Sequence, residues 1–127
     1  MPPDNNVCAG NNQLVLVVNQ ALRAYKADGT VLFTRSLSTL YGNPGGFFFD
    51  PVCRYDPFSS RWIIVSDYSV YTNTGSIVQS GMYILVSDTA DISSTYKYKY
   101  IEMKGNCGNG QCFADFPTIG LDKYGLW

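Results

Sequence analysis

The sequence contains no histidine and a single glutamate, Glu102. Without histidine, Ser-His-Asp and Cys-His catalytic arrangements are excluded. The straight-chain polar residues that favour surface helices are scarce, whereas aromatic residues make up 15% of the chain, and this composition favours strands. No segment shows a sustained apolar period of 3.6 residues, which an amphipathic helix would need. We therefore predict an all-β fold.

Charge of one sign and long apolar runs are also missing. Nine basic residues against ten acidic ones give a net charge of -1, so the positive footprint of a nucleic-acid-binding protein is absent. The longest apolar run, residues 14–18, is far shorter than the roughly 20 residues of a membrane helix. The first residues have neither a basic nor an apolar signal region, so the signal of an exported protein would be removed or lie upstream.

The four cysteines, Cys8, Cys53, Cys107 and Cys112, are an even number. Zinc is disfavoured, because there is no histidine and no CxxC pair. A closed Cys107–Cys112 loop is the natural disulfide interpretation, and it leaves Cys8 to pair with Cys53. This pattern favours an oxidising compartment, extracellular or at the cell surface. The alternative is four buried, reduced thiols.

Short strand-like runs alternate with turn signals such as Asp28-Gly29. A loop is expected at residues 42–49 and a long insert at residues 68–81. The expected strands are residues 13–19, 22–26, 30–36, 52–55, 62–67, 82–87, 96–100, 118–121 and 126–127.

An internal repeat organises these strands. An acidic residue, a short strand, a tight turn and a longer apolar strand recur from Asp4, Asp50 and Asp115, at intervals of 46 and 65 residues. Four-stranded antiparallel units of roughly 40–50 residues are typical of propeller blades. We predict one domain, residues 1–127, a partial β-propeller with blade one at 7–36, blade two at 52–103 and the inner hairpin of blade three at 117–127.

About two and a half blades do not close a ring, because typical propellers have four to eight. We therefore expect either a fragment of a larger propeller or a subunit that completes its ring or its sheet edges with other chains.

Several motifs in a fixed order carry a family resemblance. They are PPDN at 2–5, CAGN at 8–11, DPVCRYD at 50–56, RW at 61–62, VSDTAD at 86–91 and DFPTIGLD at 115–122. The order resembles the N-terminal part of a family of secreted, mostly uncharacterised β-propeller proteins that are sialidase-like in general shape. The resemblance implies a secreted scaffold with further blades, and it implies no reaction. The Asp-box of sialidases is not matched, because residues 56–62 lack its glycine.

The function expected from these features is a non-catalytic extracellular or cell-surface module for binding or structure. Its partners would be copies of itself, the missing blades, or a glycan. The alternative is part of a carbohydrate-active propeller enzyme, because paired carboxylates can bind or hydrolyse glycans and ten acidic residues are present. No cofactor is expected apart from calcium.

Two candidate site surfaces follow from the repeat and the composition. Blade symmetry would bring Asp4, Asp50 and Asp115 to one end of the central channel, where they could hold calcium or sugar hydroxyls; alternatively each caps a turn beside a proline. Aromatic side chains form the second surface, which would contact sugars or another chain unless the rings pack between blades. Its residues are Tyr68, Tyr71, Tyr96, Tyr98 and Tyr100.

Overall fold

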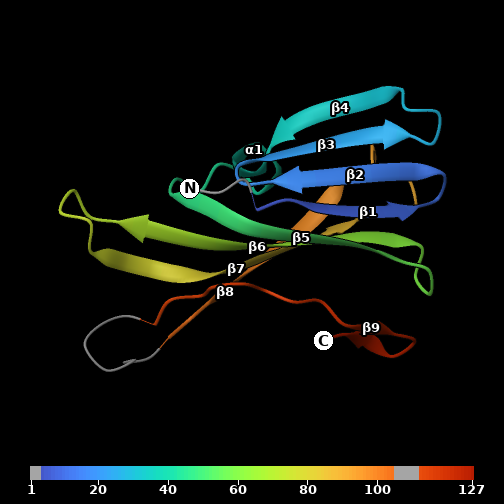
Figure 1. The fold of residues 1–127 in the computed structure, drawn as a ribbon. Coiled ribbons are helices and arrows are strands. Elements are labelled where there is room, and N and C mark those ends of the chain that lie inside the picture. Colours follow the sequence, from blue (N-terminus) through green and yellow to red (C-terminus); the bar gives the residue numbers. More distant parts are fainter. Residues whose placement is uncertain (1–3, 105–111) are drawn as a thin grey trace.

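The computed structural model describes residues 4–104 and 112–127, in which two four-stranded antiparallel sheets are followed by a two-stranded hairpin. The prediction of an all-β fold with antiparallel sheets is confirmed. Each large sheet has its strands in chain order, so every connection joins neighbours. Figure 1 shows the first sheet above the second, with the hairpin on the far side of the second sheet.

The first sheet consists of four short strands, β1 (Asn6–Gly10), β2 (Gln13–Val18), β3 (Ala21–Lys26) and β4 (Val31–Ser36). Two-residue turns connect β1 to β2 and β2 to β3, and both residues of the first turn, Asn11 and Asn12, have positive φ angles. Such angles match the twist of tight hairpins. In β2, Val15 and Val17 are buried, as alternation on one face of a strand requires. This sheet lies within one residue of the predicted first blade.

The second sheet has longer strands, β5 (Phe47–Asp56), β6 (Arg61–Tyr71), β7 (Ile77–Ser87) and β8 (Tyr96–Glu102). Two sequence expectations are wrong here. Residues 47–49 belong to β5 instead of a loop, and most of the predicted insert at 68–81 is the β6–β7 hairpin, with its turn between Tyr71 and Ile77. The serine and glycine residues of this hairpin hid its strand character, because they lower β-propensity.

A short helix, α1 (Leu37–Leu40), follows the first sheet and was not predicted. Ser36 caps it by accepting a hydrogen bond from the backbone N–H of Thr39. Just after the helix, the Tyr41 hydroxyl contacts Ser66 Oγ at 3.1 Å. Leu37 and Leu40 of the helix are buried. The contact of Tyr41 with Ser66 anchors the link between the two sheets to β6.

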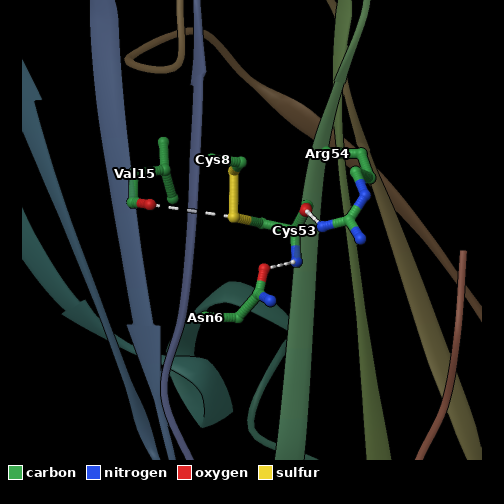
Figure 2. Close-up of a disulfide and its surroundings, with 5 residues drawn as sticks. All are labelled: Asn6, Cys8, Val15, Cys53 and Arg54. Carbon is green, nitrogen blue, oxygen red and sulfur yellow. Dashed lines mark hydrogen bonds between the residues drawn. A yellow bond between two sulfur atoms is a disulfide. The ribbon is translucent and has the colours of Figure 1, made fainter.

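A disulfide joins the two sheets. Cys8 of β1 is bonded to Cys53 of β5, 45 residues later, which confirms this predicted pair (Figure 2). Asn6 Oδ1 accepts a hydrogen bond from the Cys53 backbone N–H. The disulfide and this hydrogen bond therefore both link β1 to β5. For a loop of this length the bridge is worth about 4 kcal/mol. The other predicted pair is Cys107 with Cys112, and Cys107 lies outside the described residues.

The core lies between the sheets and includes Trp62 and Ile64 of β6 and Leu85 of β7. The Trp62 indole N–H donates to the Ala90 carbonyl at 2.8 Å, so its polar atom is satisfied although the ring is buried. The hairpin of β9 (Leu121–Asp122) and β10 (Gly125–Leu126) closes the described chain. It is shorter than the predicted pair of strands at 118–121 and 126–127, and it forms a sheet of its own. Among the described residues, no helix is long and apolar enough to cross a membrane.

Candidate functional site

The three segments that open the repeats meet at one place on the surface. A cavity of about 440 Å³ is lined by segments 4–6, 50–52 and 116–119 and by Arg54. A second cavity of about 300 Å³ shares Asp4, Asp50 and Phe116 with the first, and Asp115 lines it as well. The structure thus brings all three predicted aspartates, Asp4, Asp50 and Asp115, to the wall of the smaller cavity.

An irregularity in β5 sets the position of Asp50. The pairing of β5 with β6 shifts between Phe49 and Val52, so Asp50 and Pro51 form a bulge, and Asp50 has a φ of 46°. A bulge redirects side chains beside the regular ladder. The same pairing places Phe49 opposite Asp67 of β6. The bulge therefore brings the carboxylate of Asp50 to that of Asp67.

Asp115 reaches the site because its segment is fixed to the second sheet. The Ala114 backbone N–H donates to Ser80 Oγ at 2.9 Å, and Ala114 is buried. Next to it, the Phe113 ring stacks on Phe49 with centroids 5.3 Å apart. The backbone contact of Ala114 and the ring contact of Phe113 thus hold the neighbouring Asp115 beside β5 and β6.

The first sheet contributes through the turn between β2 and β3. Asn19 in this turn donates through Nδ2 to Asp4 Oδ2 at 2.7 Å. Its amide oxygen accepts from the backbone N–H of Asp50 at 2.9 Å. One amide therefore fixes the Asp4 carboxylate and the backbone of Asp50 relative to each other. No motif pointed to this role of Asn19, because it depends on how the two sheets pack.

Three carboxylates form a compact cluster, defined here as the aspartate cluster: Asp50, Asp67 and Asp115. One carboxylate oxygen from each lies within 4.8 Å of the other two. Asp67 is only 1% exposed, and neither of its oxygens has a hydrogen-bond partner within the described part of the chain. Burial of a carboxylate without partners is costly. The two ion pairs that the described residues form, Lys97–Asp88 and Lys104–Glu102, lie outside the cluster.

The titration of the cluster reflects this environment. Burial, followed by the negative charges of Asp50 and Asp115, raises the pKa of Asp67 to about 7. The pKa of Asp50 is also raised, first by burial and then by Asp4 and the carboxyl of Asp115. Neighbouring like charges disfavour ionisation. The site therefore attracts either protons or a cation.

Sequence reasoning missed Asp67, although one signal was present. It is a charged residue inside a long apolar strand, where β6 reads WIIVSDYSV from Trp62 to Val70. A charge in a buried strand rarely occurs without a partner. Its proximity to Asp50 and Asp115 depends on the bulge and on the docked segment 113–116, which no pattern predicts.

The tyrosines predicted as a contact surface differ in their exposure. Tyr68 is 2% exposed and belongs to the core, and Tyr96 and Tyr100 pack against the core from β8. Tyr98 is 50% exposed, with its ring edge against Tyr41. Only Tyr71 of this set lines a candidate cavity. Core packing, the alternative interpretation, thus describes Tyr68 fully and Tyr96 and Tyr100 in part.

Comparison with known proteins adds no relative: no protein-family model, no curated protein and no solved structure matches this chain.

Proposed function

We propose that this chain is a non-catalytic binding module of the extracellular space, built from propeller-type blades, and that it binds a glycan in the larger cavity. The observation that carries the proposal is the lining of that cavity. Its residues come from all three repeat openings and combine carboxylates, amides and a guanidinium with one exposed ring.

The blade interpretation is supported by topology. Both sheets have four antiparallel strands in chain order, which is the pattern of a propeller blade. The first strands of the two sheets, β1 and β5, lie against each other, and they carry the disulfide Cys8–Cys53. On this interpretation the cavity lies at the mouth of the channel, where innermost strands begin. The outer strands β4 and β8 are sheet edges through which copies of the chain could assemble.

An extracellular location is supported by the same bridge, because disulfides persist in oxidising compartments. Cys8 and Cys53 are both buried, and the bridge joins the two sheets. This role is structural, as in secreted domains.

A glycan fits the chemistry of the cavity. Sugars present hydroxyl groups in the plane of the ring and an apolar C–H face. Asp4, Asn5 and Arg54 supply acceptors and donors for hydroxyls, and Phe116, which is 79% exposed, offers a ring for the apolar face. The volume of about 440 Å³ is in the range of ligand sites, roughly 300–1,000 Å³.

The test is glycan-array binding by the purified chain, with Phe116→Ala as the variant and Phe58→Ala as the matched control. Phe58 is also an exposed phenylalanine, but it lies in the β5–β6 turn away from the cavity. We expect Phe116→Ala to lower binding roughly twofold to tenfold, because one ring contact is lost, and Phe58→Ala to leave it unchanged. Binding to no glycan, or equal loss in both variants, would contradict the proposal.

One observation favours an enzyme as a second candidate. Asp50 and Asp115 place carboxylate oxygens within 4.8 Å of each other, and glycosidases use two neighbouring carboxyl groups. Such an enzyme would release sugar from any glycan that the array identifies, and Asp50→Asn would abolish the release. Release that survives Asp50→Asn, or no release, excludes this candidate.

A further inference from the structure

We propose that the aspartate cluster, Asp50, Asp67 and Asp115, binds a calcium ion. This inference goes beyond the glycan site and does not depend on it. It rests on the donor set, on the spacing of the oxygens and on the buried carboxylate of Asp67.

The donor set consists of oxygen only. Three carboxylates offer up to six oxygens, and calcium takes six to eight oxygen ligands. The Asp4 carboxylate stands on the wall of the adjoining cavity, which is wide enough for water molecules to fill the remaining positions. A metal that prefers nitrogen or sulfur finds no histidine, because the chain has none. The chemistry thus selects a hard cation.

The coordination chemistry favours calcium over magnesium. One oxygen from each of the three carboxylates lies within 4.8 Å of the other two, so a single ion can be placed among them. Calcium accepts irregular coordination at about 2.3–2.6 Å, which suits ligands that come from three separate segments. Magnesium demands near-ideal octahedral geometry at about 2.0–2.1 Å and gives up its water reluctantly.

Asp67 is the feature that separates this cluster from an ordinary group of surface acids. Its side chain is almost completely buried, both oxygens lack partners among residues 4–104 and 112–127, and one oxygen is directed at those of Asp50 and Asp115. Without a counter-ion, an ionised carboxylate at this position would destabilise the fold. A cation supplies the missing partner to Asp67 and removes the repulsion among all three residues.

The second sheet is built so that the three ligands approach from different directions. Asp67 comes from the middle of β6, Asp50 from the bulge in β5, and Asp115 from the segment held by Ser80. Calcium would therefore crosslink two adjacent strands to a segment that follows the sheet. It would leave Arg54 and Phe116 of the larger cavity free for a ligand.

The experiment is calorimetric titration of the full chain, first stripped with chelator, with calcium chloride and with magnesium chloride, together with melting curves. The wild type should bind one calcium ion per chain, bind magnesium at least about tenfold more weakly, and melt at a higher temperature with calcium. Asp67→Asn should lose the calorimetric signal and the shift in melting temperature. The matched control is Asp28→Asn, a change in the exposed β3–β4 turn where an asparagine oxygen can still accept from Thr30.

Asp115→Asn provides a second variant that does not disturb the core, because Asp115 is exposed. It should weaken calcium binding at least about tenfold. The proposal is overturned if the wild type binds no calcium at millimolar concentration, if magnesium binds as tightly, if both cluster variants bind like the wild type, or if Asp28→Asn loses as much affinity as they do. Failure on the glycan array leaves this result unaffected, so the two proposals fail separately.

Discussion

The two large sheets share one strand order and differ in strand length. Strands β1–β4 have five or six residues each, whereas β5, β6 and β7 have 10 or 11. The second half of β5 and the first half of β6 pair with each other and form with the first sheet a shared core around the disulfide. The second half of β6 and the first half of β7 contain three buried polar residues, Asp67, Ser69 and Ser80.

This difference places a buried charge in the longer strands. Buried polar groups destabilise a protein unless they are paired, and the first sheet has no buried charged residue in its described strands. The added length of β6 contains one, Asp67. The first sheet contributes to the candidate site through Asn6 of β1 and through the β2–β3 turn, whereas the second sheet supplies the carboxylates of Asp50 and Asp67. Three measurements test how differently the two sheets behave.

The largest expected effect is loss of the bridge between the sheets. Replacing both Cys8 and Cys53 by serine should lower the free energy of unfolding by about 4 kcal/mol, because the unfolded chain regains the entropy of a 45-residue loop. Urea unfolding followed by tryptophan fluorescence, which reports on buried Trp62, measures this loss. A loss below about 1 kcal/mol would mean that packing alone holds the sheets together.

A pair of identical substitutions tests whether the sheets unfold together. Leu22 of β3 and Leu85 of β7 are both almost fully buried, so Leu22→Ala and Leu85→Ala should each cost about 3 kcal/mol. Because the two residues belong to one core cluster, both variants should keep a single unfolding transition in calorimetry. Two separate transitions in either variant would show that the sheets are independent units.

The smallest expected effect concerns pH in the absence of metal. Because the pKa of Asp67 is raised to about 7 in the folded chain from 3.8, its contribution to stability is fully present below pH 3.8 and is lost as pH rises through about 7. In chelator, the wild type should therefore lose roughly 2 kcal/mol between pH 5 and pH 8 relative to Asp67→Asn. Urea unfolding of both proteins at the two pH values measures the difference, and parallel curves would contradict it.

A large part of the fold could be predicted from the sequence. Alternating apolar residues and turn signals located the first sheet to within a residue or two, because its hairpins are short and their turn residues are typical. The Cys8–Cys53 pair was found by elimination. The prediction was wrong for residues 47–49 and 68–81, where aromatic, serine and glycine residues give no clear period although the backbone forms strands.

The candidate site was only partly predictable. Repetition of an acidic residue before each inner strand indicated Asp4, Asp50 and Asp115, and these three line one cavity. Neither Asp67 nor Asn19 belongs to the repeat, so repetition could not identify them. For the tyrosines, the alternating pattern placed Tyr96, Tyr98 and Tyr100 on one face of a strand, but such a pattern does not say how far that face is covered.

The β class, the strands of the first sheet and the acidic residues of the repeat follow from local propensity and side-chain alternation, so the sequence alone predicts them. The proximity of Asp67 to Asp50 and Asp115 comes from long-range packing. This proximity depends on a bulge in β5, the full length of β6 and the docking of segment 113–116 on Phe49 and Ser80. Contacts between residues far apart in the chain produce it, and local sequence patterns do not record such contacts.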